Sequence, residues 1–387
     1  MKKIAVVTAT RAEYGLLSPV IRALRKRESA ELRVELIVTG THLSSQYGMT
    51  VQEISERIDR KIVIPLNSDT ELDISRNQAQ ALIRFTELFS EQKYDAVLLL
   101  GDRYETLAIA IAAGNTRTPI FHLCGGDTTE GALDEWIRHC ITKISYLHFV
   151  TNEDSGRRVI QLGEDPGRVF NYGSTSIDNI LTVADMGKAE ALASIGLKDC
   201  DYALCTYHPV TMEGGNVDGQ IEEFLNAIQA FPDLCFIVTK SNADQGGARI
   251  NALLDKAETE IGNLHVYASL GVRRYLSLMK YASFVLGNSS SGIIETPAFR
   301  VPTVNIGDRQ KGRLQSRSII NCSPDTASIV AAIETALSDA HRAVCSQVVS
   351  PYGDGHAAER IAEKAVQAVQ TGAIDLKKKF YDWEMRQ

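Results

Sequence analysis

The sequence lacks a long hydrophobic run, and this absence argues against a helix that crosses a membrane. Hydrophobic residues make up 44% of the 387 positions, the share of an ordinary globular protein. The longest apolar run, around 108–113, falls far short of the roughly 20 residues that span a bilayer. Residues 1–7 also lack the apolar core and cleavage site of a signal peptide. We therefore expect a cytoplasmic protein with no membrane partner.

Excess positive charge is also absent, since 41 Lys and Arg against 48 Asp and Glu give a net charge of −7. Binding to a nucleic acid needs a concentrated basic surface that displaces counterions, so we expect no nucleic-acid partner. The seven cysteines are odd in number and form no CxxC pair, which favours free thiols. The eight histidines show no HxxxH or HExxH pattern, and we expect no metal site.

Nucleotide-cofactor motifs are missing as well. The chain has no GxxxxGK[ST] sequence, and no GxGxxG follows its first apolar run. Residues 353–358 resemble GxGxxA, but no strand leads into them, so we interpret them as the start of a helix. We expect no Walker-type NTPase and no bound cofactor.

The chain does contain two successive series of short apolar runs that alternate with amphipathic stretches. Continuous apolarity is typical of strands buried on both faces of a parallel sheet covered by helices. We expect α/β domains with doubly wound sheets at residues 1–175 and 176–365. A last helix is expected at about 357–371, and the C-terminal helix at about 366–387 is placed to pack back on the first domain. The expected strands are 4–8, 33–39, 95–100, 119–123, 146–151 and 168–172, then 202–207, 235–239, 265–268, 284–286 and 302–306.

Ligands of open parallel sheets bind beyond the carboxyl ends of the strands, and two such domains facing each other form a cleft. Arg11 stands where a helix begins, and a guanidinium beside exposed N–H groups suits a phosphate. A surface arginine close to Glu13 is the alternative. Asp102 directly follows a buried strand, which is a place for chemistry or for a helix N-cap.

The third cleft-facing loop of the first domain, after the expected strand 119–123, is crowded with carboxylates. Four acids lie within a span of nine positions after the strand, with Arg138 close behind them: Asp127, Glu130, Asp134 and Glu135. Opposed carboxylates in a dry site can hold different protonation states and divide acid and base roles between them. A solvated acidic loop is the alternative.

Polar side chains also end the strands of the second series. His208 precedes a proline, which holds it extended, and it can serve as an acid, a base or a phosphate donor, or only structurally. Residues 240–244, which include Asn242, close the next strand with several side-chain donors.

The strongest local signal is the segment GNSSSGIIE at 287–295, where a strand ends, three serines follow and a helix starts. Its N–H and O–H groups, Ser289 and Ser290 among them, suit an anion at the positive end of the helix. Glu295 cannot favour a phosphate and should serve another part of the ligand, such as sugar hydroxyls. A capping box accounts for one serine and the glutamate but not for three serines in a row.

A basic loop follows the next strand of this series. Three cations in five residues of an acidic chain favour an anionic ligand over a solvated loop. The loop contains Arg309, Gln310, Lys311 and Arg313.

These motifs together resemble the hydrolysing UDP-N-acetylglucosamine 2-epimerases, of the bacterial type that feeds sialic acid synthesis. The resemblance extends from about residue 3 to about residue 370. It rests on the number, order and spacing of TRAEYG, GDRYE, GGD with EGALDEWIRH, HPV, KSNAD, GNSSSGIIE, NIGDRQKGR and PYGDGHAAERI.

The resemblance implies two Rossmann-like domains in the arrangement of GT-B glycosyltransferases, with UDP in the cleft. It implies conversion of UDP-N-acetylglucosamine and water into N-acetylmannosamine and UDP, without metal or NAD, by a homodimer or homotetramer. The family reaction eliminates UDP across C1–C2 and then hydrates the resulting 2-acetamidoglucal.

The resemblance also implies roles for individual residues. Arg11, Ser289 and Ser290 should hold the diphosphate, Glu295 the ribose hydroxyls, and Asn242 should lie beside the nucleotide. The remaining matches are His208, Asp102 and Asp134 at active-site positions, and the loop of Arg309, Gln310, Lys311 and Arg313 that closes on the sugar phosphate.

One position departs from the family pattern. Many relatives have Glu third in an HxEGG-type loop, where this chain has Cys124. Either Asp127, the nearest acid of the loop, takes over, or that glutamate is dispensable in this branch. The tasks of proton removal and delivery at C2 stay open among Asp102, Asp127 and Asp134.

Three other functions fit the same motifs. A close variant of the reaction uses UDP-2,4-diacetamido-2,4,6-trideoxyglucose, on the route to legionaminic acid. A GT-B glycosyltransferase would use the same cleft but would need an acceptor site. A UDP-sugar-binding regulator without turnover would gain nothing from the clustered acids.

Overall fold

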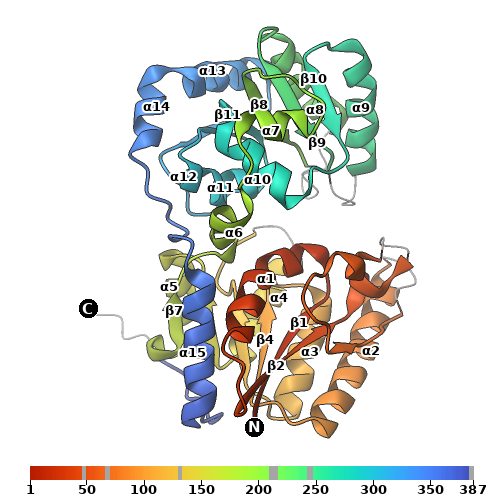
Figure 1. The fold of residues 1–387 in the computed structure, drawn as a ribbon, viewed down its shortest axis with the longest axis vertical. Helices are drawn as coiled ribbons and strands as arrows, with labels where there is room; N and C mark the ends of the chain where they lie inside the picture. The colour runs from red at the N-terminus through yellow and green to blue at the C-terminus, as the bar shows by residue number, and fades with distance from the viewer. Residues whose placement is uncertain (46–48, 66–69, 130–132, 209–216, 242–246, 383–387) are drawn as a thin grey trace. The chain divides into compact units, whose positions relative to one another are not determined.

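The computed structural model describes residues 1–387 apart from 46–48, 66–69, 130–132, 209–216, 242–246 and 383–387. The chain divides into two compact units (Figure 1). Unit 1 holds Met1–Thr128, Ala132–Asp178 and the C-terminal segment from Tyr352, and unit 2 is built on Asn179–Pro351. Helix α6 (Thr175–Val183) spans the boundary between them.

Unit 1 contains a parallel sheet in which seven strands of the described residues pair in the order β3-β2-β1-β4-β5-β6-β7. The order reverses direction between β1 and β4, as in a doubly wound sheet. Its strands are β1 (Lys2–Thr8), β2 (Leu32–Val38), β3 (Arg60–Lys61), β4 (Ala96–Leu100), β5 (Ile120–Leu123), β6 (Leu147–Val150) and β7 (Val169–Asn171). Its main helices are α1 (Arg11–Arg25), α2 (Glu71–Glu91), α3 (Tyr104–Asn115), α4 (Leu133–Ile144), α5 (Glu153–Gln161) and α15 (Ala357–Thr371).

Strand β1 shows why the apolar runs are continuous. Ile4 and Val6 pack into a core formed with α1 and α15, whereas Ala5 and Val7 pack into a second core formed with α2, α3 and α4. Successive side chains of a strand point to opposite faces, so both faces must be apolar. Full burial of one such aliphatic side chain contributes about 1.5–3 kcal/mol.

Unit 2 repeats the design with the strand order β10-β9-β8-β11-β12-β13, again parallel and reversing at β8 and β11. Its strands are β8 (Tyr202–Thr206), β9 (Cys235–Thr239), β10 (Leu264–Tyr267), β11 (Phe284–Gly287), β12 (Thr303–Ile306) and β13 (Ile319–Cys322). Its helices are α7 (Lys188–Ala193), α8 (Val217–Gln229), α9 (Gly247–Glu260), α10 (Gly271–Tyr281), α11 (Ser291–Ile294), α12 (Thr296–Phe299), α13 (Thr326–Leu337) and α14 (Asp339–Ser346).

The expected fold class is confirmed, and each strand predicted from apolar runs is present within a few residues. Two edge strands were missed, for physical reasons. Strand β3 consists of Arg60 and Lys61 only, and β13 has a partly exposed pattern, so neither carries a continuous apolar run. Among the described residues, no helix is long and apolar enough to cross a membrane.

Helix α15 confirms the last helix expected at about 357–371, whereas the helix expected at about 366–387 does not continue past Thr371 in the described residues. Helix α15 begins at Ala357, where Asp178 accepts the N–H groups of Ala357 and Ala358 at 3.2 and 2.8 Å. It ends at Thr371, because Gly372 adopts a left-handed backbone (φ +64°) that stops the helix. Figure 1 shows α15 beside α1 in unit 1, and the two helices are in contact.

The chain beyond α15 packs on unit 1 through a buried ion cluster. Nζ of Lys378 lies 2.5 Å from the carboxylate of the fully buried Glu164, and donates to the carbonyls of Lys143 and Ser145 at the end of α4. Lys143 and His148 contact the same carboxylate at 2.9 and 3.0 Å. Burial alone would raise the pKa of Glu164, but hydrogen bonds from His148, Lys143 and Lys378 lower it to about 2.

Removing Lys378 should destabilise unit 1. We expect Lys378→Met to lower the free energy of unfolding by about 3 kcal/mol near neutral pH, because it leaves a buried carboxylate short of a cation. Urea denaturation followed by circular dichroism measures this, with Lys379→Met, an exposed neighbour, as the matched control. The difference in unfolding free energy between the wild type and Lys378→Met should shrink as the pH falls from about 4.5 towards 2, because Glu164 then takes up a proton. Equal free energies of unfolding for Lys378→Met and Lys379→Met would contradict this role of Lys378.

Candidate active site

In unit 1, the loop between β1 and α1 is fixed by a capping box. The carboxylate of Glu13 accepts the N–H groups of Ala9 and Thr10 at 2.8 and 3.2 Å, and Thr10 Oγ1 accepts the N–H of Glu13. Burial raises the pKa of Glu13 to about 7. Arg11, the first residue of α1, is exposed. Glu13 therefore turns into the start of the helix, and the guanidinium of Arg11 stands at the carboxyl edge of the sheet.

Asp102, one residue after the Gly101 that follows β4, is anchored by a buried arginine. Arg138 is 2% exposed, and its Nε donates to Oδ2 of Asp102 at 2.8 Å while Nη2 contacts the same oxygen. Within the described part of the chain, no hydrogen bond reaches Oδ1 of Asp102. The N-cap of α3 is Arg103, so Asp102 does not cap that helix.

Arg138 also holds the next loop and its own helix. Its Nη1 donates to the carbonyl of Asp127 at 2.5 Å and to the carboxylate of Glu135 at 2.9 Å. Burial would lower the pKa of Arg138, but Asp102, Asp127 and Glu135 raise it, so the side chain stays charged. One buried cation thus organises the acids after two neighbouring strands.

The loop after β5 is shaped by backbone constraints. Gly126 has φ +78°, and a Cβ there would lie 2.1 Å from the carbonyl oxygen of Ser155. Oδ1 of the next residue, Asp127, accepts the hydroxyls of Thr151 and Ser155 at 2.7 and 2.6 Å. Cys124 is partly buried and has a left-handed backbone (φ +64°). The carboxylate of Asp127 therefore ties this loop to α5 and to the residue that follows β6.

The first turn of α4 carries the remaining acids that the sequence singled out. Asp134 is exposed there, and Glu135 beside it reaches Arg138 and His139. Negative charge at a helix N-terminus is favoured by the helix dipole by about 0.3–1 kcal/mol. Glu130 lies outside the described residues.

In unit 2, the junction of two strand ends requires a glycine. A Cβ on Gly287 would lie 2.0 Å from the carbonyl oxygen of Thr206, so only glycine fits where β11 meets β8. The serines follow at once. Ser290 occupies the N-cap of α11 without a side-chain cap bond, so the capping-box alternative does not hold. Helix α11 has only four residues, and the hydroxyl groups rather than a long helix dipole remain as the anion-binding feature.

Glu295 lies at the end of this segment, partly buried, and accepts a hydrogen bond from the hydroxyl of Ser291. Burial raises the pKa of Glu295 to about 7, although the Ser291 bond lowers it in part. The side chain is thus poised to change protonation near neutral pH, and an ionised Glu295 is a strong acceptor for ligand hydroxyls.

His208 follows β8 by two residues and is buried. Its Nδ1 lies 3.1 Å from Oγ of Ser241, which follows β9, and its backbone pairs with the side chain of Asn288. Asn288 is not among the predicted site residues, since a neutral amide between a glycine and the serines carries no charge and no motif of its own. Asn242 lies outside the described residues.

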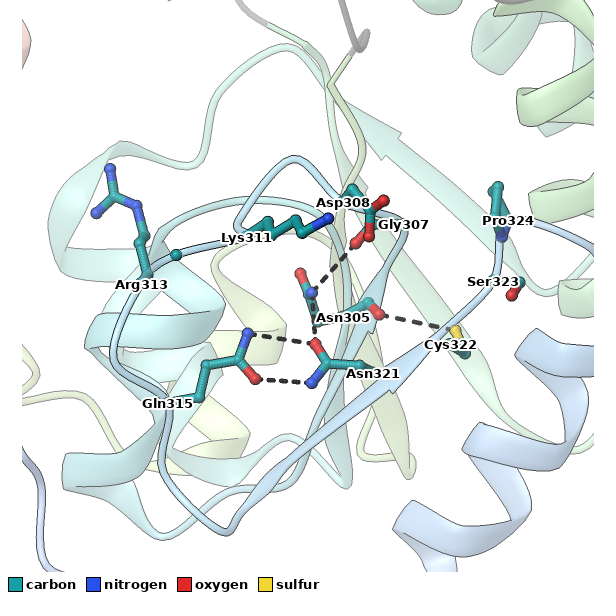
Figure 2. Close-up of a pocket in the computed structure, with 11 residues that line it drawn as sticks. Asn305, Gly307, Asp308, Lys311, Arg313, Gln315, Asn321, Cys322, Ser323 and Pro324 are labelled. Atoms are coloured by element: carbon teal, nitrogen blue, oxygen red, sulfur yellow. Dashed lines mark hydrogen bonds between the residues drawn. The ribbon is translucent and has the colours of Figure 1, made fainter. Parts of the chain in front are cut away.

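The basic loop after β12 borders an open pocket of about 640 Å³, within the range of small-molecule sites. Figure 2 shows the amides of Asn305, Gln315 and Asn321 hydrogen-bonded to one another in this pocket. Lys311 and Arg313 belong to its lining.

Two other residues of the basic loop turn towards the serine loop instead. Arg309, which is exposed, and Gln310, which is buried, both donate to the carbonyl oxygen of Asn288. Among the described residues, no group of three or more His, Cys, Asp and Glu side chains is arranged to hold a metal ion.

Comparison with known proteins gives the family. The profile of the UDP-N-acetylglucosamine 2-epimerase family matches residues 22–365. A GDP/UDP-N,N'-diacetylbacillosamine 2-epimerase (hydrolyzing) of Campylobacter jejuni is 40% identical over 324 residues, 83% of this chain and 84% of the relative. The polysialic acid biosynthesis protein P7 of Escherichia coli is 38% identical over 356 residues, 91% of this chain and 90% of the relative.

A solved structure shows the same fold. The UDP-GlcNAc 2-epimerase from Neisseria meningitidis bound to UDP-GlcNAc superposes with a TM-score of 0.78 at 19% identity, covering 95% of this chain and all of that one. The chain therefore belongs to the UDP-N-acetylglucosamine 2-epimerase family and is a UDP-sugar 2-epimerase.

Proposed function

We propose that the protein is a hydrolysing 2-epimerase that converts UDP-N-acetylglucosamine and water into N-acetylmannosamine and UDP. The observation that carries this proposal is Asp102, a carboxylate anchored through one oxygen by the buried Arg138 and placed at the end of a parallel strand. A glycosyltransferase needs no such anchored base for a C–H bond, whereas epimerisation at C2 does.

The groups of unit 2 suit the UDP moiety. The hydroxyls of Ser289 and Ser290 donate to the diphosphate, and the guanidinium of Arg309 adds positive charge at the same strand edge. The ionised carboxylate of Glu295 accepts the ribose hydroxyls. Arg11 of unit 1 is a further phosphate donor, and the family assigns Asn242 to the nucleotide.

The chemistry requires charge separation at C1. Breaking the bond between C1 and the phosphate oxygen leaves negative charge on UDP and electron deficiency on the ring, while the C2 proton moves to a base. Fixed cations near the diphosphate stabilise the leaving group. Water then adds its hydroxyl to C1 of the 2-acetamidoglucal, and a proton returns to C2 from the opposite face.

The three carboxylates of unit 1 differ in how they are held. Asp102 keeps one oxygen without a hydrogen bond within the described residues and is the base that we assign to the C2 proton. Asp134 stands exposed on the first turn of α4 and is our candidate for proton delivery. Asp127 is also held through one oxygen, but by two neutral hydroxyls that tie its loop to α5 and to the residue after β6, and we assign it to positioning of the loop.

This assignment also bears on Cys124, the position where many relatives have glutamate. We assign the positioning of this loop to Asp127, whose Oδ1 accepts the hydroxyls of Thr151 and Ser155, and the proton transfers to Asp102 and Asp134. We infer that the missing glutamate is dispensable in this branch, and that Asp102 and Asp134 suffice.

The relatives support a second candidate substrate equally well. The Campylobacter relative is named for N,N'-diacetylbacillosamine, whose UDP derivative is UDP-2,4-diacetamido-2,4,6-trideoxyglucose, and the Escherichia coli relative for polysialic acid biosynthesis. Their identities, 40% and 38%, favour neither substrate. Both sugars carry the 2-acetamido group and the UDP that the proposed mechanism uses.

Proton NMR in D₂O tests the reaction. With UDP-N-acetylglucosamine and no added metal or NAD, we expect free UDP and N-acetylmannosamine deuterated at C2, because the proton returned to C2 comes from solvent. Asp102→Asn should lower the rate by about 10²-fold or more, as loss of a general base does. UDP accompanied by undeuterated N-acetylglucosamine would contradict the proposal and indicate a transferase that leaks to water.

The same assay with UDP-2,4-diacetamido-2,4,6-trideoxyglucose decides the substrate. A kcat/KM at least tenfold higher on that donor would assign the chain to the diacetamido reaction and would leave the mechanism unchanged. Activity on neither donor would contradict the proposed function.

The protonation of Glu295 should be visible in UDP affinity. Its pKa of about 7 means that the carboxylate is ionised above pH 7 and protonated below. Since ribose hydroxyls donate to the ionised form, we expect UDP affinity relative to that of Glu295→Gln to fall by up to tenfold per pH unit below 7. Calorimetric titration from pH 8 to 5.5 measures this ratio, which cancels the protonation of UDP itself.

The matched control for that titration is Glu222→Gln, which changes an exposed glutamate of α8 in the same unit. Its UDP affinity should follow the wild-type protein at every pH. A constant ratio between wild type and Glu295→Gln would show that Glu295 does not contact the nucleotide.

A further inference from the structure

Asn288 joins three loops of unit 2. It follows Gly287 at the end of β11 and is fully buried. Its side chain forms a reciprocal pair with the backbone of His208, since the N–H of His208 donates to Oδ1 at 2.7 Å and Nδ2 donates to the His208 carbonyl at 2.8 Å. The side chain thus continues the ladder between β8 and β11 past its last backbone pair, Gly287 with Thr206.

The main chain of Asn288 holds the third loop. Its carbonyl oxygen accepts two hydrogen bonds, from Nη1 of Arg309 at 3.0 Å and from Nε2 of Gln310 at 2.9 Å. Gln310 is 3% exposed, so its bond is shielded from water. A single residue therefore connects the segments that follow β8, β11 and β12.

The connected segments are those to which the proposed function assigns ligand contacts. His208 follows β8, Ser289 and Ser290 follow Asn288 directly, and Arg309 follows β12. Buried polar groups must be paired, and each pair fixes the distance between the two segments that it joins. Fixing binding groups before the ligand arrives lowers the entropy lost on binding.

We propose that Asn288 is a positioning residue for the UDP-sugar, an inference that rests on the proposed function. It sets the backbone of His208 and the Arg309–Gln310 segment in register with the hydroxyls of the serine loop. It acts through these residues and not on the reacting atoms, so its loss weakens nucleotide binding and slows turnover together.

The experiment compares Asn288→Ala with a matched control at the opposite edge of the same sheet. Asn263 precedes β10, and its Nδ2 donates to the carbonyls of Phe231 and Leu234 at 2.9 and 2.8 Å. Asn263→Ala therefore also removes a side-chain amide that makes two hydrogen bonds to the backbone, but far from the carboxyl strand ends. For each protein we would measure the Kd of UDP by calorimetry, kcat and KM for the UDP-sugar, and unfolding in urea.

We expect Asn288→Ala to raise the Kd of UDP and the KM at least tenfold and to lower kcat. Asn263→Ala should lower the urea midpoint while its Kd and kcat/KM stay within twofold of the wild type. The proposal is overturned if the Kd of UDP and the kcat/KM of Asn288→Ala both stay within twofold of the wild type. It is also overturned if Asn263→Ala raises the Kd of UDP as much as Asn288→Ala does.

Asn288→Asp provides a second test that does not depend on the alanine variant folding. The introduced carboxylate keeps the side-chain size and can accept the N–H of His208, but it cannot donate to the His208 carbonyl until it is protonated. The ratio of the Kd of this variant to that of the wild type should therefore shrink as the pH falls from 8 to 6. A ratio that does not change with pH overturns the pairing argument.

The wild-type protein separates this proposal from the proposed function. A wild type that neither binds UDP nor turns over either donor would refute both. A wild type that binds and turns over, with Asn288 variants that match it, would refute only the positioning role.

Discussion

Parallel strands of one sheet all end at the same edge, and the polar groups of this protein depend on that constraint. In unit 1 it brings the segments after β4 and β5 together at Arg138, and in unit 2 those after β8, β11 and β12 together at Asn288. In each unit, a buried polar residue thus connects loops distant in sequence. The sheet supplies the rigid base, and the buried residue sets the spacing of the loops.

Burial also sets the charge of the groups involved. Arg138 remains a cation because several acidic side chains surround it, while Glu295, with a serine hydroxyl as its hydrogen-bond partner, has a pKa of about 7. Fixed charges and aligned hydroxyl donors of this kind stabilise charge separation when a bond breaks.

Much of this could be predicted from the sequence. Continuous apolar runs identified the strands of both sheets, because burial on two faces leaves no alternation, and the polar residues at their ends identified the loops. The short edge strands β3 and β13 could not be found, since Arg60–Lys61 and the half-exposed Ile319–Cys322 carry no such run. The positioning role proposed for Asn288 could not be predicted either, because its hydrogen bonds to His208 and Arg309 span 80 and 21 residues and depend on the tertiary fold.

The central claim is that one site eliminates UDP and then hydrates the glucal. The most direct measurement supplies the purified protein with 2-acetamidoglucal and UDP and follows the sugar by proton NMR. The account predicts that N-acetylmannosamine appears, and that without UDP, or with Asp134→Asn, it forms much more slowly. A glucal that persists unchanged while the same preparation hydrolyses UDP-N-acetylglucosamine would contradict the elimination mechanism.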